Sequence, residues 1–395
     1  MSLLSFYSTK NKKALFGIFF FLFVFEVIIG GSGRVFEIAG GITLRKLTFP
    51  IALIISLLFF FYFKNIKKEI AFIFIIFFCL QGFSTILGFI NYGNDERVLE
   101  NFLYQSFLLL LPFYSFFIND SRDIKHVAQI IKVSSLIMAA AYIILLFLLL
   151  FNVVAFGDVY ALTEDSPDFM ARGESGFLYK GFLYLCLSLF FFENEKSIFW
   201  KRFKELFICI AIYFTFVRGF IVSLILTLFF HQFFFKSFVK GISIMIAALF
   251  LIIAFGDYYE SSSFDRYESD LIRKQQFEQV ISAVTPNSFF IGHGFGEGVA
   301  IRDNHMEVTY LEIFHKQGIL GLLFWFFILG YIIMQYLECK RLGYEKKARP
   351  FLLSSFFIYL QSITNPFLIN SIGLNMIIIS IVSLNIYCRQ TEIKY

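Results

Sequence analysis

Residues 206–235 read LFICIAIYFTFVRGFIVSLILTLFFHQFFF, an apolar run that the triplet VRG at 217–219 interrupts near its middle. A membrane-spanning helix needs about 20 apolar residues, and shorter stretches occur in tilted or buried helices. The run therefore fits either one long helix or two spans, residues 206–216 and 220–235. This choice decides the fold, because a single helix would move every later loop to the other side of the membrane.

The charges of the loops favour two spans with a break at Arg218. Cytoplasmic segments of membrane proteins are enriched in Lys and Arg. With a cytoplasmic N-terminus and two spans, the cytoplasmic segments hold 21 Lys and Arg residues and nine acids, and the outer segments hold 12 and 19. Lys132 and Glu26 then remain inside the membrane. We therefore expect both termini to be cytoplasmic and the two longest loops, residues 157–176 and 256–317, to lie outside.

The composition is that of a polytopic integral membrane protein. Of the 395 residues, 58% are hydrophobic and 16% are charged, and the mean hydropathy is +0.74. We predict an all-α fold with about 12 transmembrane helices in a single membrane domain, residues 1–395. The predicted spans are Ala14–Ile29, Leu47–Phe63, Ile70–Ile90, Phe102–Ile118, Val127–Phe151, Phe177–Phe192, Leu206–Phe216, Phe220–Phe235, Val239–Phe255, Gly318–Tyr336, Phe351–Ile363 and Phe367–Tyr387. The long outer loop, residues 256–317, precedes the tenth helix and is expected to contain short helices.

Several classes of function are excluded by composition and placement. The net charge of +5 is too small to indicate a nucleic-acid partner, and no cleavable signal sequence is evident. The five cysteines lack the paired spacing of a metal site or a disulfide framework. Neither ATP nor a nucleotide sugar is expected outside the cytoplasmic membrane. Group transfer at the outer loops therefore needs a donor that is already activated and carried by the bilayer.

Residues 286–323, PNSFFIGHGFGEGVAIRDNHMEVTYLEIFHKQGILGLL, place a glycine-rich loop with many ionisable residues before an apolar helix. Its glycines at 292, 294, 296 and 298 do not match the G-x-G-x-x-G fingerprint of dinucleotide-binding proteins. We interpret them as a tight turn whose backbone can approach a ligand or another helix closely. A loop that binds no ligand is equally compatible with the pattern.

Arg218 lies between two apolar segments, where an unpaired charge costs several kcal/mol, so it should face a cavity or a partner. One interpretation is a structural salt bridge to an acid such as Glu174 or Glu307. The other is an anion clamp, because a guanidinium group stays charged and binds phosphate in a bidentate fork.

A second candidate, Arg266, lies in a segment that is expected to form a helix on the membrane surface. Asp265 and Glu268 have the spacing of a capping box. On this helix Arg266, Arg273 and Lys274 are solvated or contact lipid headgroups, and Arg266 is also a candidate substrate contact. The residues that share its apolar face are Tyr267, Leu271, Phe277, Ile281 and Val284.

The long outer loop also supplies candidates for a general base. No H-E-x-x-H or related zinc spacing occurs on a helix, so no metal site is expected. Removing a proton from a sugar hydroxyl needs a base close to the lipid surface, and His305 and Glu307 are the candidates. His315 is expected at the membrane interface and His293 within its turn.

These features together resemble one known family. Residues 215–219 (TFVRG) form a break between spans and are followed by a long outer loop with an arginine near its start. The loop contains G-x-G and then residues 307–311 (EVTYL) and 318–321 (GILG). This order is similar to that of the O-antigen polymerase and ligase (Wzy-type) family, over about residues 206–323 together with the number of spans. The resemblance implies a metal-independent, inverting glycosyltransferase of the membrane-embedded GT-C-like class, without cofactors.

The resemblance also implies roles for individual residues. Arg218 and Arg266 would contact the diphosphate of an undecaprenyl-diphosphate-linked glycan, and Arg172 and Tyr310 would be further substrate contacts. Glu307 stands where ligases of the family have a histidine, and His305 lies two residues earlier. This departure leaves open which of His305 and Glu307 is the base, and it favours a polymerase over a ligase.

We therefore expect a polymerase of lipid-linked repeat units that makes O-antigen, capsular or exopolysaccharide chains at the outer face of the bacterial cytoplasmic membrane. Its expected partners are the undecaprenyl-diphosphate-linked donor and acceptor, membrane lipids, a chain-length regulator and a flippase. The alternatives are an O-antigen ligase or protein O-oligosaccharyltransferase with the same donor, and a polysaccharide flippase or secondary transporter. A transporter would distribute charge through several spans and contain internal repeats, whereas this chain concentrates its charge at one outer face.

Overall fold

A computed structural model describes most of the chain as an all-α membrane protein. The described residues are 10–31, 33, 35–39, 42–62, 68–163, 168–172, 176–195, 197–246, 264–296 and 298–389. Their contacts divide the chain into two compact units. Unit 1 comprises residues 1–70, 110–216 and 381–395, and unit 2 comprises residues 71–109 and 217–380.

Unit 1 is built mainly from helices that pack in pairs, α2 with α7, α3 with α6, and α9 with α7 and α10. Two short antiparallel hairpins, β1–β2 and β3–β4, lie between the helices along the chain. The elements of this unit are α2 (Lys10–Ile29), β1 (Glu37–Ala39), β2 (Ile42–Thr43), α3 (Leu44–Tyr62), α6 (Leu111–Phe117), α7 (Ser121–Leu150), α8 (Phe156–Thr163), β3 (Phe169–Arg172), β4 (Gly176–Tyr179), η2 (Lys180–Phe182), α9 (Leu183–Phe191), η3 (Phe192–Asn194) and α10 (Ile198–Phe214).

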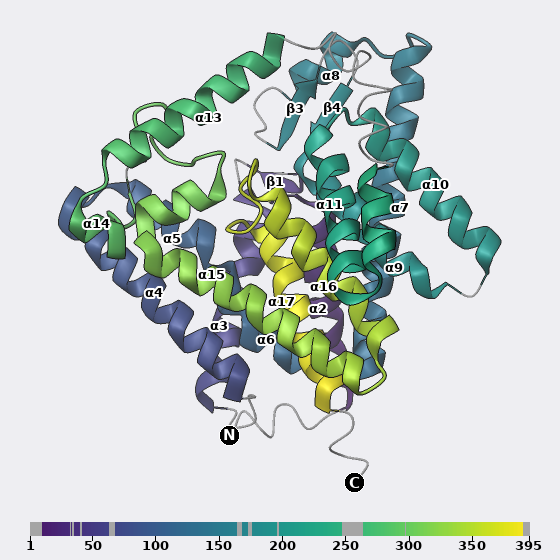
Figure 1. Cartoon of the computed structure of the whole chain (residues 1–395), viewed down its shortest axis with the longest axis horizontal. Coiled ribbons are helices and arrows are strands. Elements are labelled where there is room, and N and C mark those ends of the chain that lie inside the picture. Colours follow the sequence, from purple (N-terminus) through teal and green to yellow (C-terminus); the bar gives the residue numbers. More distant parts are fainter. Residues whose placement is uncertain are drawn as a thin grey trace. The chain divides into compact units, whose positions relative to one another are not determined.

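Unit 2 contains the glycine-rich loop and the long helix that follows it. Helices α4 and α15 lie side by side in this unit (Figure 1), with Phe77 of α4 against Phe324 and Trp325 of α15. Helix α16 packs against both α11 and α15. The elements are α4 (Lys68–Tyr92), α5 (Glu96–Gln105), η1 (Ser106–Leu110), α11 (Arg218–Phe235), α13 (Phe264–Ser282), α14 (Pro286–Ile291), α15 (Thr309–Arg341), α16 (Glu345–Gln361) and α17 (Ser371–Arg389), of which α4, η1 and α17 extend into unit 1.

The predicted break at Arg218 is confirmed. Helix α10 ends at Phe214 and α11 begins at Arg218. Between them Phe216 has a φ of 53°, in the left-handed region that residues other than glycine rarely adopt. The apolar run of residues 206–235 is therefore two helices.

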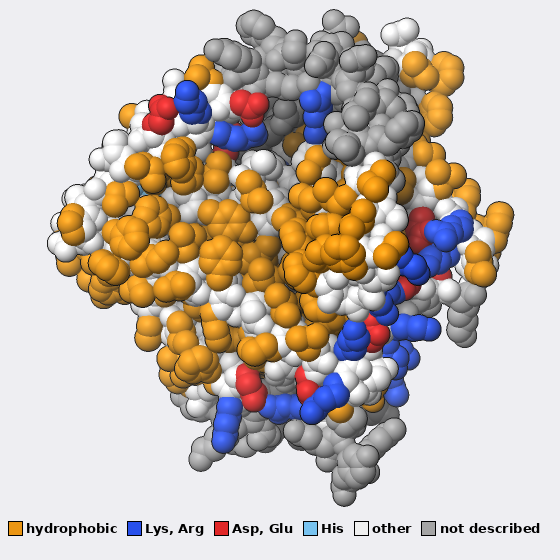
Figure 2. All heavy atoms as spheres, viewed as in Figure 1, with side chains coloured by type: hydrophobic (Ala, Val, Ile, Leu, Met, Phe, Trp, Pro, Cys, Tyr) orange, Lys and Arg blue, Asp and Glu red, His pale blue; other side chains and the backbone are white. Residues whose placement is uncertain are grey.

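Among the described residues, six helices are long and apolar enough to cross a membrane, namely α3, α4, α7, α11, α15 and α17. Shorter apolar helices occur at Gly17–Ile29 and Lys180–Phe191. Figure 2 shows hydrophobic side chains gathered over α4, α14 and α15, with charged side chains over α13. Exposed apolar patches of this size are unusual on soluble proteins and fit contact with lipid.

Two predicted spans differ from single helices. The predicted fourth span, residues 102–118, consists of the end of α5, the 3₁₀ helix η1 and α6. Helix α6 begins at Leu111, and Pro112 lies in its first turn, where proline fits a helix start. The predicted sixth span, residues 177–192, begins inside strand β4 and continues as η2 and α9. The predicted ninth span, Val239–Phe255, lies mostly outside the described residues.

Glu26, which the sequence leaves alone in the first span, has a partner in unit 1. Arg45 at the start of α3 donates from Nε to Glu26 Oε2 and from Nη2 to Glu26 Oε1, both at 3.1 Å. Arg45 also donates to the carbonyl oxygens of Glu26 and Gly31. Both side chains are less than 10% exposed. Because Glu26 lies near the end of α2 and Arg45 at the start of α3, this bidentate ion pair joins the two helices.

We predict that Glu26→Ala lowers the thermal stability of the detergent-solubilised protein, because it leaves the Arg45 guanidinium buried without its carboxylate, at a cost of about 3–5 kcal/mol. The double variant Glu26→Gln, Arg45→Met removes both charges and should melt close to the wild type. A thermal unfolding scan measures both. Equal melting temperatures for Glu26→Ala and the wild type would contradict the prediction.

Candidate functional site

The candidate site lies at the Thr309 end of α15, where this helix is kinked. Gly318 has a φ of 63° and a ψ of −161°, which are not helical values. The turn before the kink carries Glu312, His315, Lys316 and Gln317, which are all buried. The apolar part of the helix follows the kink, so the polar turn is confined to one end.

The glycine-rich loop packs its backbone against this kink and against α4. The amides of His293 and Gly294 donate to the carbonyl oxygens of His315 and Lys316 at 2.8 and 3.0 Å, and the Phe295 amide donates to the Ser84 carbonyl of α4 at 2.9 Å. A Cβ at Gly294 would lie 2.4 Å from the Gly88 nitrogen. Of the two uses predicted for these glycines, close approach to another helix is the one that the structure shows.

A fully buried ion pair occupies the polar turn. Lys316 Nζ lies 2.8 Å from Glu312 Oε1, and both side chains have no exposed surface. Glu312 Oε2 accepts from the Met306 amide at 3.0 Å. Lys316 also donates to the Asn304 carbonyl at 2.7 Å and to the side-chain oxygen of Asn101 on α5. All three ammonium protons therefore have acceptors, which offsets the cost of burying the charge.

His305 connects this buried pair to the surface. Its Nδ1 lies 3.1 Å from Glu312 Oε1. A carboxylate only accepts hydrogen bonds, so Nδ1 carries the proton and, in the neutral ring, Nε2 carries the lone pair. Nε2 lies 4.0 Å from Glu100 Oε1, and the side chain is 26% exposed. The ring packs on Tyr104, with centroids 4.3 Å apart.

Glu307 is placed differently, although it is only two residues away. Its Oε1 lies 2.7 Å from Arg302 Nη2, and its Oε2 lies 3.3 Å from Arg273 Nε on α13. Solvent or lipid headgroups were the expected contacts of Arg273. Its guanidinium pairs with Asp270 as well as with Glu307, and the second pair joins this loop to α13. Both oxygens of the Glu307 carboxylate face guanidinium groups.

The remaining predicted residues are Tyr310, Arg218, Arg266 and Arg172. Tyr310 donates its hydroxyl to the Tyr359 carbonyl at 2.7 Å and so joins α15 to α16. Arg218 is half-buried at the first position of α11. Arg266 lies near the start of α13 and Arg172 at the end of β3, and their side chains lie outside the described residues.

The other loop histidines are packed. His315, expected at the membrane interface, is 6% exposed, and its ring lies 4.7 Å from the His293 ring, centroid to centroid. Burial lowers the pKa of His293, so this ring is neutral at neutral pH. His293 was expected to pack within its turn, and its ring contacts that of His315 on α15.

A layer of glutamines continues the polar turn between α4, α5 and α15. Gln105 Oε1 lies 3.4 Å from Gln81 Nε2 and 3.3 Å from Gln317 Nε2. These are long hydrogen bonds between side chains that are at most 1% exposed. The three glutamine side chains thus form a buried polar layer next to the turn that carries Lys316.

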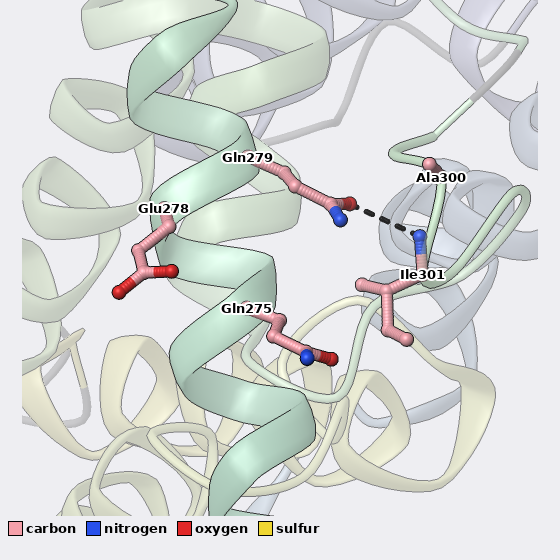
Figure 3. Close-up of a pocket in the computed structure, with 5 residues that line it drawn as sticks. All are labelled: Gln275, Glu278, Gln279, Ala300 and Ile301. Atoms are coloured by element: carbon pink, nitrogen blue, oxygen red, sulfur yellow. Dashed lines mark hydrogen bonds between the residues drawn. The ribbon is translucent and has the colours of Figure 1, made fainter.

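A shallow pocket lies between helix α13 and the loop that precedes His305. Its lining residues are Gln275, Glu278, Gln279, Ala300 and Ile301, and Gln279 Oε1 accepts from the Ile301 amide at 3.0 Å (Figure 3). These five residues include no basic side chain, so the pocket does not suit a diphosphate. Within the described part of the chain, no three His, Cys, Asp or Glu side chains gather as a metal site.

The comparisons with known proteins agree with the motifs. No family model matches the chain. Over 368 residues the chain is 29% identical to a protein of Shigella flexneri named O-antigen polymerase, and the match covers 91% of this chain and 92% of the relative. The resemblance to the Wzy-type O-antigen polymerase family is thereby confirmed over nearly the whole length.

We predict that Gly88→Ala lowers the yield of folded protein, because the new Cβ would lie 2.0 Å from the Phe295 carbonyl oxygen. Gly82→Ala is the matched control on the same helix, where no atom lies within 4 Å of the new Cβ. Alanine is favoured over glycine inside a helix by about 0.5–1 kcal/mol, so the control should fold at least as well as the wild type. Size-exclusion profiles in detergent distinguish the two, and equal profiles would contradict the assignment of Gly88 as a packing position.

Proposed function

We propose that this relative of the Wzy-type O-antigen polymerases joins undecaprenyl-diphosphate-linked repeat units into O-antigen, capsular or exopolysaccharide chains. The observation that carries the proposal is the similarity to an O-antigen polymerase along 91% of the chain. The apolar helices support a multi-pass protein of the bacterial inner membrane. The charged cluster at one end of α15 supplies groups that such a transfer needs.

The proposed arrangement in the membrane follows from the loop charges. Both termini are cytoplasmic, and the Thr309 end of α15 faces outward, where lipid-linked repeat units are exposed. The fold is of the GT-C-like class with about 12 spans. A chain-length regulator and a flippase act with the enzyme.

The proposed reaction is a displacement at the anomeric carbon of the donor glycan. The oxygen of an acceptor hydroxyl forms the new C–O bond, the bond from the anomeric carbon to the diphosphate breaks, and the hydroxyl proton passes to a base. Attack from the side opposite the diphosphate inverts the anomeric centre, and no metal ion takes part. Arginines stabilise the charge that develops on the diphosphate, with Arg218, Arg266 and Arg172 in this role.

The contacts favour His305 over Glu307 as the base. His305 holds its Nδ1 against Glu312 and presents Nε2 at a partly exposed position. Glu307 already faces Arg302 and Arg273 with both oxygens. A base must have a lone pair within reach of the hydroxyl proton, and His305 meets this condition without breaking an ion pair. Glu307 then orders the loop between Arg302 and α13.

A glycan ligase or protein O-oligosaccharyltransferase would use the same donor and differ in acceptor. A flippase would need no base. The relative's name and the glutamate at the position of the ligase histidine favour the polymerase.

We predict that deleting the gene in its host removes the polysaccharide ladder and leaves single repeat units on the surface. The wild type should restore the ladder, and Arg218→Ala should not, because the leaving diphosphate loses its counter-charge. Gel analysis of surface glycans, with immunoblots of membranes as a loading control, measures this. Full-length polymer that accumulates on the lipid carrier of the deletion strain would indicate a ligase. An unchanged ladder in that strain would contradict both enzyme functions and favour a transporter.

We predict that His305→Ala lowers the polymerisation rate about 10²–10⁴-fold, the range for loss of a general base. Glu307→Gln should lower it less than tenfold, because its role is to order the loop. The assay uses purified protein in lipid vesicles with repeat units extracted from the deletion strain. The opposite ranking of the two variants would make Glu307 the base.

A further inference from the structure

We propose that Glu312 and Lys316 are positioning residues for His305, and that the pair sets the orientation of its ring. This inference rests on the proposed function and extends it to two residues whose side chains are completely buried. Neither residue needs to touch the substrate. Their contacts decide how the histidine is presented.

The geometry of the chain of contacts carries the inference. Lys316 Nζ, Glu312 Oε1 and His305 Nδ1 form consecutive contacts of 2.8 and 3.1 Å. The first two side chains are fully buried, and the third is 26% exposed. The arrangement therefore runs from the interior of unit 2 to its surface and ends at a ring nitrogen with a lone pair.

Glu312 is fixed in place from several directions. Its Oε2 accepts from the Met306 amide at 3.0 Å, and its Oε1 meets both Lys316 and His305. The carboxylate therefore cannot rotate without losing hydrogen bonds at a fully buried position. Since Nδ1–H must point at this carboxylate, the ring plane and the direction of Nε2 are fixed as well.

Lys316 is needed to keep the carboxylate in this role. A buried carboxylate without a counter-charge would bind a proton and become unable to accept from both neighbours. Lys316 supplies the counter-charge, and Asn101 and the Asn304 carbonyl hold its ammonium group. Asn101 also donates to Asn304 Oδ1 at 3.1 Å, so the residue that precedes His305 is bound to the same network.

The charges that face His305 come from two helices. Glu312 and Lys316 lie on α15, and Glu100 lies on α5 with its Oε1 4.0 Å from Nε2. Tyr104 of α5 covers one face of the ring. Removing Glu312 therefore removes the negative charge that contacts the ring. Removing Lys316 removes the positive charge that contacts Glu312.

A purely structural ion pair makes a different prediction from a positioning pair. Neutralising both partners of a structural pair with side chains of similar size is often tolerated, because no buried charge is left unpaired. If the pair positions a catalytic group, the same double change lowers the activity even though the protein folds. The double variant Glu312→Gln, Lys316→Met separates the two roles.

The test measures polymerisation by purified variants in lipid vesicles, with lipid-linked repeat units extracted from the deletion strain, from pH 5 to pH 9. We expect the double variant to match the wild type in membrane yield and melting temperature and to lose at least tenfold in kcat with little change in KM. Ser354→Ala, at a buried position on α16 away from the cluster, is the control for a core substitution. Wild-type activity in the double variant would overturn the inference.

The single variants add a readout that misfolding does not produce. Each single variant should lower kcat with little change in KM, because Glu312→Gln removes the carboxylate that accepts from Nδ1 and Lys316→Met removes the ammonium group that holds this carboxylate. Wild-type kcat in either folded variant would contradict the inference.

The outcome for the inference is separable from the outcome for the proposed function. If wild-type protein forms no ladder in these vesicles while it is folded, the polymerase proposal fails. If the wild type polymerises and His305→Ala does not, but the double variant retains full activity, only the positioning role of Glu312 and Lys316 fails.

Discussion

The kink of α15 at Gly318 is the constraint on which the candidate site depends. A non-helical residue interrupts the ladder of backbone hydrogen bonds, and carbonyl groups of the preceding turn then need other donors in a protein that spans a membrane. The glycine-rich loop provides them, because the amides of His293 and Gly294 bond to the carbonyls of His315 and Lys316. The loop is thereby fixed to the polar turn, and residues that follow it, including His305, are brought beside Glu312.

Part of this arrangement was predictable from the sequence. The triplet at 217–219 and the loop charges predicted the break between α10 and α11, since an arginine and a glycine interrupt an otherwise apolar run. Helices α4, α7 and α11 also agree with the predicted spans, because each contains a long apolar stretch. The fourth and sixth predicted spans were wrong as single helices. Hydropathy reports burial in an apolar environment and does not distinguish a broken helix or a strand end from a continuous helix.

The candidate site was predictable in its position along the chain but not in its contacts. His305 and Glu307 were selected as ionisable residues of the long loop, and the sequence could not show that they face different partners. Glu312 and Lys316 were missed, although their i, i+4 spacing just before an apolar helix is typical of a helical ion pair. Asn101 could not be found from sequence, because it is more than 200 residues from Lys316 and meets it only in the folded unit.

Among the described residues, two ion pairs have both side chains buried, and these pairs differ in their further contacts. Arg45 directs its hydrogen bonds to Glu26 and to backbone carbonyls at the junction of α2 and α3, so this pair joins two helices. The pair of Glu312 and Lys316 has a third member, His305, which reaches the surface. Burial makes a carboxylate and an ammonium expensive to keep unless their partners are complete. In the second pair one of those partners is a histidine ring at the surface, so the buried charges are in direct contact with a group that solvent can reach.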